Sequence, residues 1–147
     1  MTREEEQARS LGPCNATALR KAARHVTQLY DSVLAESGLR STQRSILAQI
    51  ARSDGAGVIE LADALVLDRS SFSHNLQPLV RDGFVSIEVD PRDKRARIVR
   101  LTDLGRERLE QSNLLWQRAQ DQFEAAFGKQ DAKDLRETLM RVVSVKF

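Results

Sequence analysis

The spacing of the apolar residues departs from a helical pattern in one stretch of this chain, and that departure restricts its fold more than any other feature. Before and after it, apolar residues recur at intervals of three and four, which is typical of helices. In between, Val85, Ile87 and Val89 alternate with polar residues, and residues 96–101 form a second β-prone run. Residues 90–95, between the two runs, begin with Asp-Pro, a pair that favours a turn. The sequence therefore predicts a mainly α protein with a small β-hairpin.

Helix signals lie close together just before the hairpin. A helix is expected to begin near Ser41 or Thr42, either of which can cap it, and residues 58–65 form a short second helical pattern. Asp68 is a good N-cap for a third helix, which ends at Gly83. Two short helices with a tight joint, followed by a hairpin, form the layout of a winged helix-turn-helix. In that fold the second helix enters the major groove of DNA.

Longer helical patterns flank this unit. Apolar residues recur on one face of residues 18–34, Thr102 can cap a long helical region, and residues 132–145 form a last amphipathic helix. These apolar faces exceed what one small winged domain can cover, so we expect a homodimer. Residues 1–12 are mostly polar and are predicted to be a flexible arm.

The third helix of the unit has one apolar and one polar face. Phe72, Leu76 and Leu79 are expected to face the core. Serine can bond phosphate or a base edge, and Asn and Gln can pair with adenine, so the polar face suits DNA reading. The candidate reading residues are Arg69, Ser70, Ser71, Ser73, His74, Asn75 and Gln77. The alternative is that this is only a solvated face of the helix.

The turn of the hairpin is strongly basic, although the net charge of the chain is only +2. Residues 92–100 contain five basic side chains and one acid. Guanidinium groups on a tight hairpin can enter the minor groove, whose negative potential attracts them, and a carboxylate can hold an arginine in one geometry. The candidate wing residues are Arg92, Asp93, Lys94, Arg95 and Arg97. The alternative is a charged, solvated turn.

Composition argues against several other classes of protein. A chain of 147 residues fits one compact domain, no apolar run approaches the about 20 residues of a membrane span, and the acidic start is unlike a signal peptide. We therefore expect a cytoplasmic protein. One cysteine and two histidines provide neither an internal disulfide nor a metal site. Catalytic spacings and a Gly-rich phosphate loop are missing, so we expect neither an enzyme nor a cofactor.

Several short motifs follow one another from the second helix of the unit to the end of the hairpin. They are Glu60-Leu61-Ala62, Asp68-Arg69-Ser70-Ser71, Ser73-His74-Asn75-Leu76, Leu79-Val80-Arg81-Asp82-Gly83, Asp93-Lys94-Arg95 and Leu101-Thr102. In this order they resemble the MarR family of winged helix-turn-helix transcription regulators. The resemblance covers nearly everything after the N-terminal arm.

The resemblance implies a domain organisation. The chain would have one domain, residues 13–147, in which residues 13–37 and 103–147 interlock with a partner copy and residues 41–101 bind DNA. A two-fold symmetric reader of this kind is expected to prefer a pseudo-palindromic operator in double-stranded DNA.

The resemblance also implies roles for single residues. Arg95 would enter the minor groove, with Asp93 bracing it. Many members of the family have Arg where this chain has His74, so the base preference at that position is not carried over.

Members of the family often lose DNA affinity when a small phenolic or aromatic acid binds between the dimerisation helices and the reading domain. The resemblance therefore implies a repressor released by such a ligand, with a pocket at His25, Tyr30, Arg44 and Trp116. Arg44 can pair with a carboxylate, and Trp116 can stack on a ring. The alternative is that the two aromatic residues belong to the core or an interface and that the other two are solvated.

Cys14 raises a further alternative, a thiol-based peroxide sensor, because a helix N-terminus lowers the pKa of a thiol. In the thiol-sensing branch of the family, however, the sensing position matches Ala16, and the supporting tyrosines match Ser41 and Arg44. A winged helix that binds only another protein is the remaining alternative.

Overall fold

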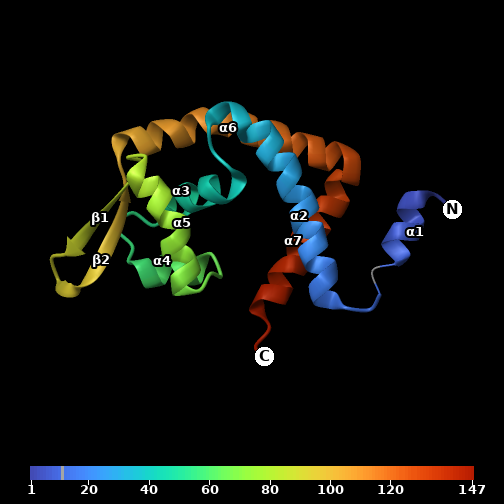
Figure 1. Cartoon of the computed structure of the whole chain (residues 1–147), viewed down its shortest axis with the longest axis horizontal. Helices are drawn as coiled ribbons and strands as arrows, with labels where there is room; N and C mark the ends of the chain where they lie inside the picture. The colour runs from blue at the N-terminus through green and yellow to red at the C-terminus, as the bar shows by residue number, and fades with distance from the viewer. Residues whose placement is uncertain (11) are drawn as a thin grey trace.

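The computed structural model describes residues 1–10 and 12–147 and has the predicted mainly helical fold with one hairpin (Figure 1). Leu11, within the predicted arm, lies outside the described residues. The elements are α1 (Arg3–Arg9), α2 (Asn15–Leu34), the 3-10 turn η1 (Ala35–Ser37), α3 (Ser41–Arg52), α4 (Val58–Ala64), α5 (Arg69–Arg81), β1 (Val85–Asp90), β2 (Asp93–Leu101), α6 (Asp103–Phe127) and α7 (Lys129–Ser144).

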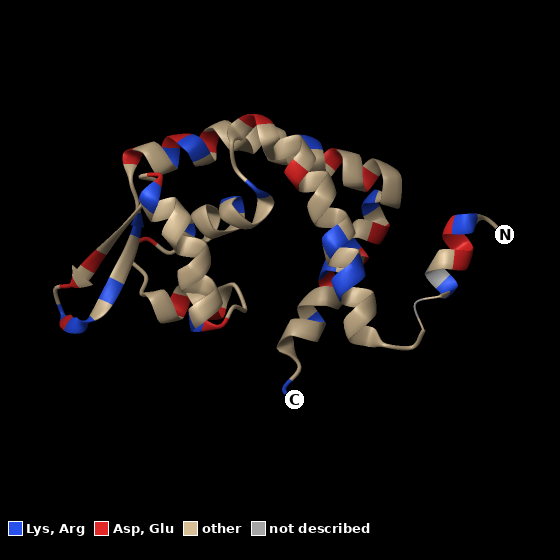
Figure 2. Ribbon diagram, viewed as in Figure 1, with Lys and Arg blue, Asp and Glu red and all other residues tan. Residues whose placement is uncertain are grey.

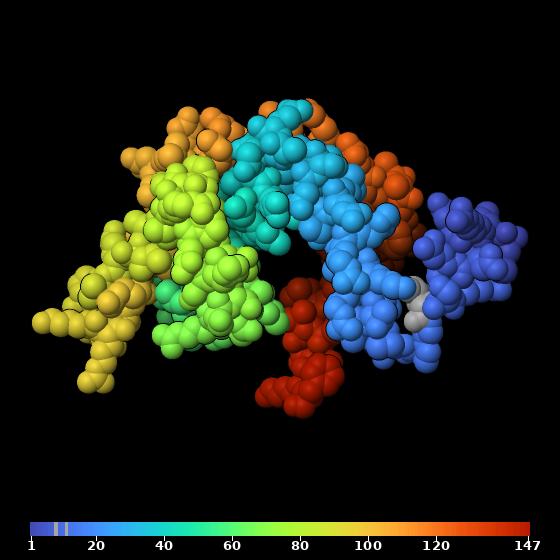
Figure 3. Space-filling model, viewed as in Figure 1, coloured from blue at the N-terminus to red at the C-terminus, as the bar shows by residue number. Residues whose placement is uncertain are grey.

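The long helix α6 connects two halves of the molecule (Figure 1). We call residues 41–101 the winged half and residues 15–37 together with 103–144 the helical half. Helix α6 packs against α2, α3 and β2, and α7 packs against α6. The space-filling view shows an open notch between α4 and α5 on one side and α2 and α7 on the other (Figure 3). The two halves therefore meet along α3 and α6.

The hydrophobic core lies in the winged half. Phe72 and Leu79 are fully buried and Leu76 is almost so, which confirms the predicted apolar face of α5. They pack with buried residues of α3, α4 and the hairpin, which are Ile46, Leu47, Ile50, Leu61, Ala62, Phe84, Val85, Val99 and Leu101. This core fixes α5 and the hairpin in one unit.

Two predicted helix caps are present. The backbone N–H of Ser71 donates to Oδ1 of Asp68 at 2.6 Å, and the backbone N–H of Gly105 donates to Oγ1 of Thr102 at 3.0 Å. Each cap satisfies an amide that has no partner within its own helix. The starts of α5 and α6 are thus determined by their own sequences.

Helix α3 begins differently from the prediction that Ser41 or Thr42 caps it. The backbone N–H of Ser41 donates to Oδ1 of Asp31 in α2 at 2.7 Å, and that of Arg40 donates to Oε1 of Gln43 at 2.9 Å. A carboxylate from a neighbouring helix replaces the local cap, because the fold brings α2 against the start of α3. The predicted cap was wrong, although the predicted start of the helix was right.

The predicted flexible arm contains the short helix α1. Thr2 and Glu5 form a capping box: the backbone N–H of Thr2 donates to Oε2 of Glu5 at 2.8 Å, and that of Glu5 donates to Oγ1 of Thr2 at 3.2 Å. The acidic first turn and Arg9 in the last turn also match the helix dipole. Residues 3–9 are therefore helical, and the flexibility of the arm stays a prediction.

The strands of the hairpin are longer than predicted. Val85 pairs with Leu101 and Asp90 with Asp93, so only Pro91 and Arg92 form the turn. The register shifts after Val89, which places the extra residues of β2 in a bulge near the tip. Residues 93–95, predicted to be turn, belong to β2 because the bulge accommodates them within the strand.

The winged half is joined to α6 by a very close approach. Gly105, in the first turn of α6, lies against the backbone of Phe84, and a Cβ at this position would overlap the Phe84 carbonyl. The Thr102 hydroxyl also donates to the carbonyl of Gly83 at 2.6 Å. Only glycine allows α6 to leave the hairpin at this distance.

Within residues 1–10 and 12–147, no helix is both long and apolar enough to cross a membrane.

Candidate nucleic-acid interface

Helix α5 presents a continuous polar face to solvent. Five of the seven predicted reading residues have exposed side chains, at spacings of one and four that place them on one side of the helix. These five are Arg69, Ser70, Ser73, His74 and Gln77. This face is opposite the buried Phe72, Leu76 and Leu79.

The other two predicted reading residues lie at the border of this face. Ser71 and Asn75 are half-buried, and Nδ2 of Asn75 donates to the Ser71 carbonyl at 2.9 Å. The amide of Asn75 is therefore bonded to its own helix, one turn earlier. Sequence periodicity did not anticipate this, because it does not show which polar side chains bond back to the backbone.

Near the hairpin tip, Arg95 is held through its backbone. All five predicted wing residues are exposed, and Figure 2 shows basic residues at the tip of the hairpin. The backbone N–H of Arg95 donates to Oδ1 of Asp93 at 2.9 Å. In the part of the chain that the structure describes, the Arg95 guanidinium has no hydrogen bond or ion pair. Asp93 thus holds the main chain of Arg95 and leaves its cation free.

Arg92 and Arg97 have partners near the tip. Nε of Arg92 lies 3.6 Å from Oδ1 of Asp90, and Nη1 of Arg97 donates to the carbonyls of Lys94 and Ala96, each at 3.3 Å. The Arg97 guanidinium therefore closes the bulge of β2 that carries Arg95.

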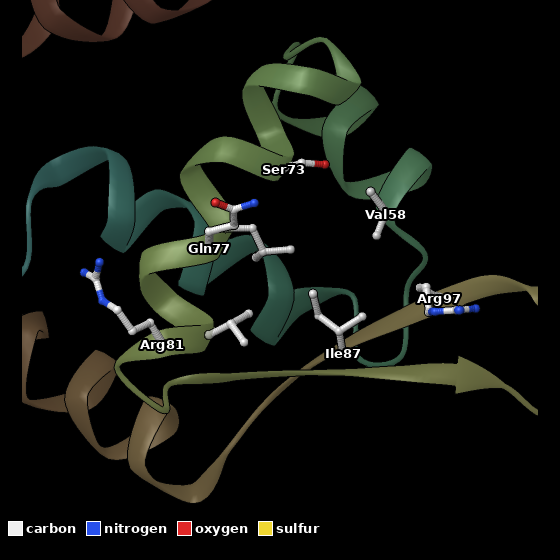
Figure 4. A pocket seen from close by; sticks show the side chains of 8 residues that line it. Val58, Ser73, Gln77, Arg81, Ile87 and Arg97 are labelled. Atoms are coloured by element: carbon white, nitrogen blue, oxygen red, sulfur yellow. The ribbon is translucent and has the colours of Figure 1, made fainter.

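A groove of about 420 Å³ separates α5 from the hairpin (Figure 4). Its lining residues come from α5, both strands and the start of α4, and they are Val58, Ser73, Leu76, Gln77, Val80, Arg81, Ile87 and Arg97. Reading residues of α5 and a cation of the wing therefore border one groove.

Arg81 is a cation that the sequence analysis missed as a site residue. It lies one helical turn after Gln77, is exposed, and has its Nε 3.4 Å from Oδ1 of Asp82. The spacing of four from Gln77 is the signal that could have identified it.

The structure brings together two of the four predicted effector-site residues. The guanidinium of Arg44 lies over the Trp116 ring, 4.9 Å from its centroid. Arg44 also donates from Nε to Oγ of Ser112 at 3.0 Å and from Nη2 to Oδ1 of Asn113 at 2.7 Å. Burial, with a smaller effect from Arg52, lowers the pKa of Arg44. This cation connects α3 with α6.

The other two predicted effector-site residues lie elsewhere. The hydroxyl of Tyr30 donates to Oε1 of Gln120, and burial raises the pKa of Tyr30, as does nearby Glu124. His25 is exposed on α2. Neither the groove beside α5 nor a second cavity, between η1 and α6, is lined by any of the four predicted residues.

Cys14 is an exposed free thiol at the N-cap of α2. The Thr17 hydroxyl donates to its Sγ at 3.2 Å, and this hydrogen bond, more than any other contact, lowers the pKa of the thiol. In the described residues, no cluster of His, Cys, Asp and Glu could hold a metal ion.

Comparison with known proteins assigns the family. The model of the MarR family matches residues 37–96, which include α3, α4, α5 and most of the hairpin. The M. tuberculosis transcriptional regulator MosR, solved in complex with DNA, is 32% identical over 89% of this chain and 94% of its own, with a TM-score of 0.81. This chain belongs to the MarR family. The predicted family and the winged helix fold are confirmed.

Two further relatives of this MarR-family protein align over shorter regions. The uncharacterized HTH-type transcriptional regulator YdgJ of Bacillus subtilis is 27% identical over 106 residues, 72% of this chain and 65% of YdgJ. The transcriptional activatory protein BadR of Rhodopseudomonas palustris is 33% identical over 72 residues, 47% of this chain and 41% of BadR. The chain thus spans less than two thirds of each. Its family consists of transcription regulators and not of enzymes.

Proposed function

We propose that this MarR-family chain is a sequence-specific DNA-binding transcription regulator that acts in the cytoplasm. The observation that carries this proposal is the groove between α5 and the wing. Ser73 and Gln77, from the reading face, and Arg97, from the wing, line the same groove. Helix α5 then reads the major groove while the free guanidinium of Arg95 enters the adjacent minor groove.

The proposed regulator is a homodimer. Apolar residues at the end of α6, along α7 and just after it are exposed in the single chain, and they are Phe127, Leu139, Met140, Val142, Val143, Val145 and Phe147. Exposed apolar residues in such number support an interface between proteins. A symmetric dimer presents two copies of α5, which fits a pseudo-palindrome with half-sites about one helical turn apart.

DNA retention at low salt tests the proposal. We expect DNA-cellulose to retain the wild-type protein, and Arg95→Ala to weaken this retention at both subunits of the dimer. Arg118→Ala is the matched control, because Arg118 is an exposed cation on α6, away from the wing. If the wild-type protein is not retained, or if both variants lose retention equally, the proposed DNA interface is wrong. Protein-only binding would then explain the winged helix.

We further propose that a small aromatic acid releases this protein from DNA. Arg44 and Trp116 support a site between the two halves, because a half-buried guanidinium next to an indole ring suits a carboxylate on an aromatic ring. The proposed pocket also involves Tyr30, which bonds Gln120 one turn after Trp116, and His25, which is exposed on α2.

Trp116 provides a direct readout of this site, because it is the single tryptophan of the chain. Salicylate should change its fluorescence and weaken DNA binding, and Arg44→Gln should weaken both effects. Benzyl alcohol, which lacks the carboxylate, is the control ligand. If salicylate has no effect on fluorescence or on DNA binding, the proposed effector site is wrong.

The proposed direction of regulation is repression. Transcription in vitro from a promoter that carries the retained DNA should fall when the protein is added and recover with salicylate. An increase in transcription would instead match the description of the relative BadR.

A further inference from the structure

The outer part of the wing, the β1–β2 hairpin, is not packed against α5. The groove of about 420 Å³ lies between α5 and the strands, and Ile87 and Val89 are exposed, at 43% and 51%. Figure 4 shows Ile87 on β1 facing α5 across this space. Contacts at the root of the hairpin must therefore determine the angle of the wing relative to α5.

The root of the hairpin is attached to the turn between α3 and α4. The backbone N–H of Val99 donates to the Ala56 carbonyl at 3.0 Å, and Gly57 forms a β-bridge with Ile98. Together with the buried Val85, Val99 and Leu101, these contacts hold the root of the hairpin. They do not extend to the outer part of the wing.

Arg100 adds side-chain contacts at this root. Its Nη1 lies 2.9 Å from Oδ1 of Asp54, in the turn after α3, and its Nε lies 3.8 Å from Oε2 of Glu88, on β1. Its guanidinium also lies against Gly55, where a Cβ would be only 3.0 Å from Nη2. One cation thus connects both strands of the wing with the helix-turn-helix.

We propose that Arg100 is a positioning residue, which sets the angle of the wing and thereby places Arg95 for the minor groove. The inference rests on the proposed DNA-binding function. Each ion pair is exposed and contributes little to folding by itself. The wing extends well beyond the root, so a small rotation there displaces the tip much further. A weak contact at the root can therefore have a clear effect on DNA affinity.

The rival explanation is that Arg100 simply binds a phosphate. The two explanations predict opposite effects when its acidic partners are removed. If only charge matters, loss of Asp54 or Glu88 removes repulsion from DNA and strengthens binding. If Arg100 positions the wing, the same loss weakens binding, because the guanidinium no longer has its anchor.

The first test measures the affinity of Asp54→Ala and Glu88→Gln for DNA that the wild-type protein retains. We expect each variant to weaken binding by about three- to tenfold. This is the free energy of one or two exposed ion pairs, converted to a ratio of affinities. Glu60→Gln is the matched control, because Glu60 is an exposed acid of the winged half with no ion pair among the described residues. Equal or tighter binding by both variants would overturn the proposal.

The second test is a double-mutant cycle between Arg100→Ala and Arg95→Ala. If Arg100 acts by placing Arg95, its replacement should cost affinity in the wild-type background and almost none in the Arg95→Ala background. The salt slope should also be the same for Arg95→Ala and for the double variant. Additive losses, or a slope that falls by a further unit, would mean that Arg100 is itself a phosphate contact.

Two controls distinguish a wrong role for Arg100 from loss of folding and from failure of the proposed DNA-binding function. Arg100→Lys keeps the charge and should recover part of the affinity that Arg100→Ala loses. Such recovery would show that the lost affinity is not caused by loss of folding. If the wild-type protein binds no DNA, the proposed function fails. If it binds DNA and the cycle is additive, only the role of Arg100 fails.

Discussion

The winged half and the helical half bury their apolar residues to very different extents. Helix α5 has 13 residues and buries Phe72, Leu76 and Leu79, whereas α7 has 16 residues and buries only Ala132. Helix α2, with 20 residues, buries only Leu34. Both halves have amphipathic helices, but the winged half buries more of their apolar faces. The difference indicates that the winged half has its own core, and it supports the proposal that a second chain completes the helical half.

The largest expected effect comes from breaking the apolar face of α7. Leu139→Glu with Val143→Glu places two charges one turn apart on that face, and we expect a monomer by light scattering. Operator affinity should fall by about 100-fold or more, because the two half-sites are no longer bound together. The winged half should keep its fold, since none of its core residues is changed.

A charge exchange on the opposite face of α7 is the control for this dimer test. Glu137→Lys with Arg141→Glu leaves the apolar face intact and should leave a dimer with normal affinity. A monomeric wild-type protein at micromolar concentration would contradict the comparison between the halves.

Arg95 tests the winged half without affecting the dimer. Arg95→Ala should weaken binding to every DNA sequence by about 2–4 kcal/mol per dimer, because a charge-assisted contact is lost in each subunit. The salt slope should decrease by about one to two, at about 0.9 per phosphate charge neutralised. Titrations of operator and scrambled DNA over a salt series measure both quantities. An unchanged slope would mean that the wing does not touch DNA.

Gly105 tests the joint between the halves. Gly105→Ala should lower the free energy of unfolding by about 1–3 kcal/mol, because its Cβ overlaps the backbone of Phe84. Gly57→Ala is the matched control, since its Cβ would make only an ordinary contact, 3.6 Å from the Arg97 carbonyl. Urea unfolding compares the two variants. Equal midpoints would show that α6 can shift away from the hairpin at little cost.

The side-chain caps of two helices were predictable from the sequence. Asp68 and Thr102 cap α5 and α6 as predicted, because a cap needs only an acceptor three residues before an amide. The order of helices and strands followed from the spacing of apolar residues in the same way.

Contacts between distant residues were not predictable from one sequence. Ser41 finds its acceptor on Asp31, in another helix, and Arg100 bonds Asp54, 46 residues earlier. The free guanidinium of Arg95 and the tied one of Arg97 are likewise alike in sequence and differ only in the folded bulge. The sequence therefore predicts exposed cations in the wing, while the contacts of each arginine needed the fold.

Replacement of His74 tests the sequence specificity of DNA binding by the winged half. His74→Ala should relax discrimination at one base pair per half-site, by about 1–3 kcal/mol if the contact with the base is direct. The salt slope should change less than for Arg95→Ala, because a base edge carries no phosphate charge. Competition between the operator and single-base variants measures this discrimination. Equal losses on operator and scrambled DNA would make His74 a backbone contact.

The smallest effect is expected at Cys14, at the start of the helical half. Its thiol pKa is lowered mainly by the hydrogen bond from Thr17, so its thiolate persists to lower pH than that of an ordinary cysteine. Thr17→Val should raise this pKa and move the pH dependence of iodoacetamide alkylation upward. Cys14 is the single cysteine, so the alkylation rate reports on it alone. An unchanged profile would mean that the hydroxyl does not stabilise the thiolate.

A lowered pKa does not by itself make Cys14 a peroxide sensor. A sensing thiolate must transmit its oxidation to the DNA-binding half, yet in the described residues the only side chain that bonds Cys14 is Thr17, on the same helix. At the two positions where the resemblance implies tyrosines in thiol-sensing members of the family, this chain has Ser41 and Arg44, and the Arg44 side chain donates to Ser112. Cys14→Ser should therefore leave the effect of an organic hydroperoxide on DNA binding unchanged. If the hydroperoxide releases the wild-type protein from DNA but not Cys14→Ser, the thiol does control the winged half, and the two halves are coupled through the start of α2.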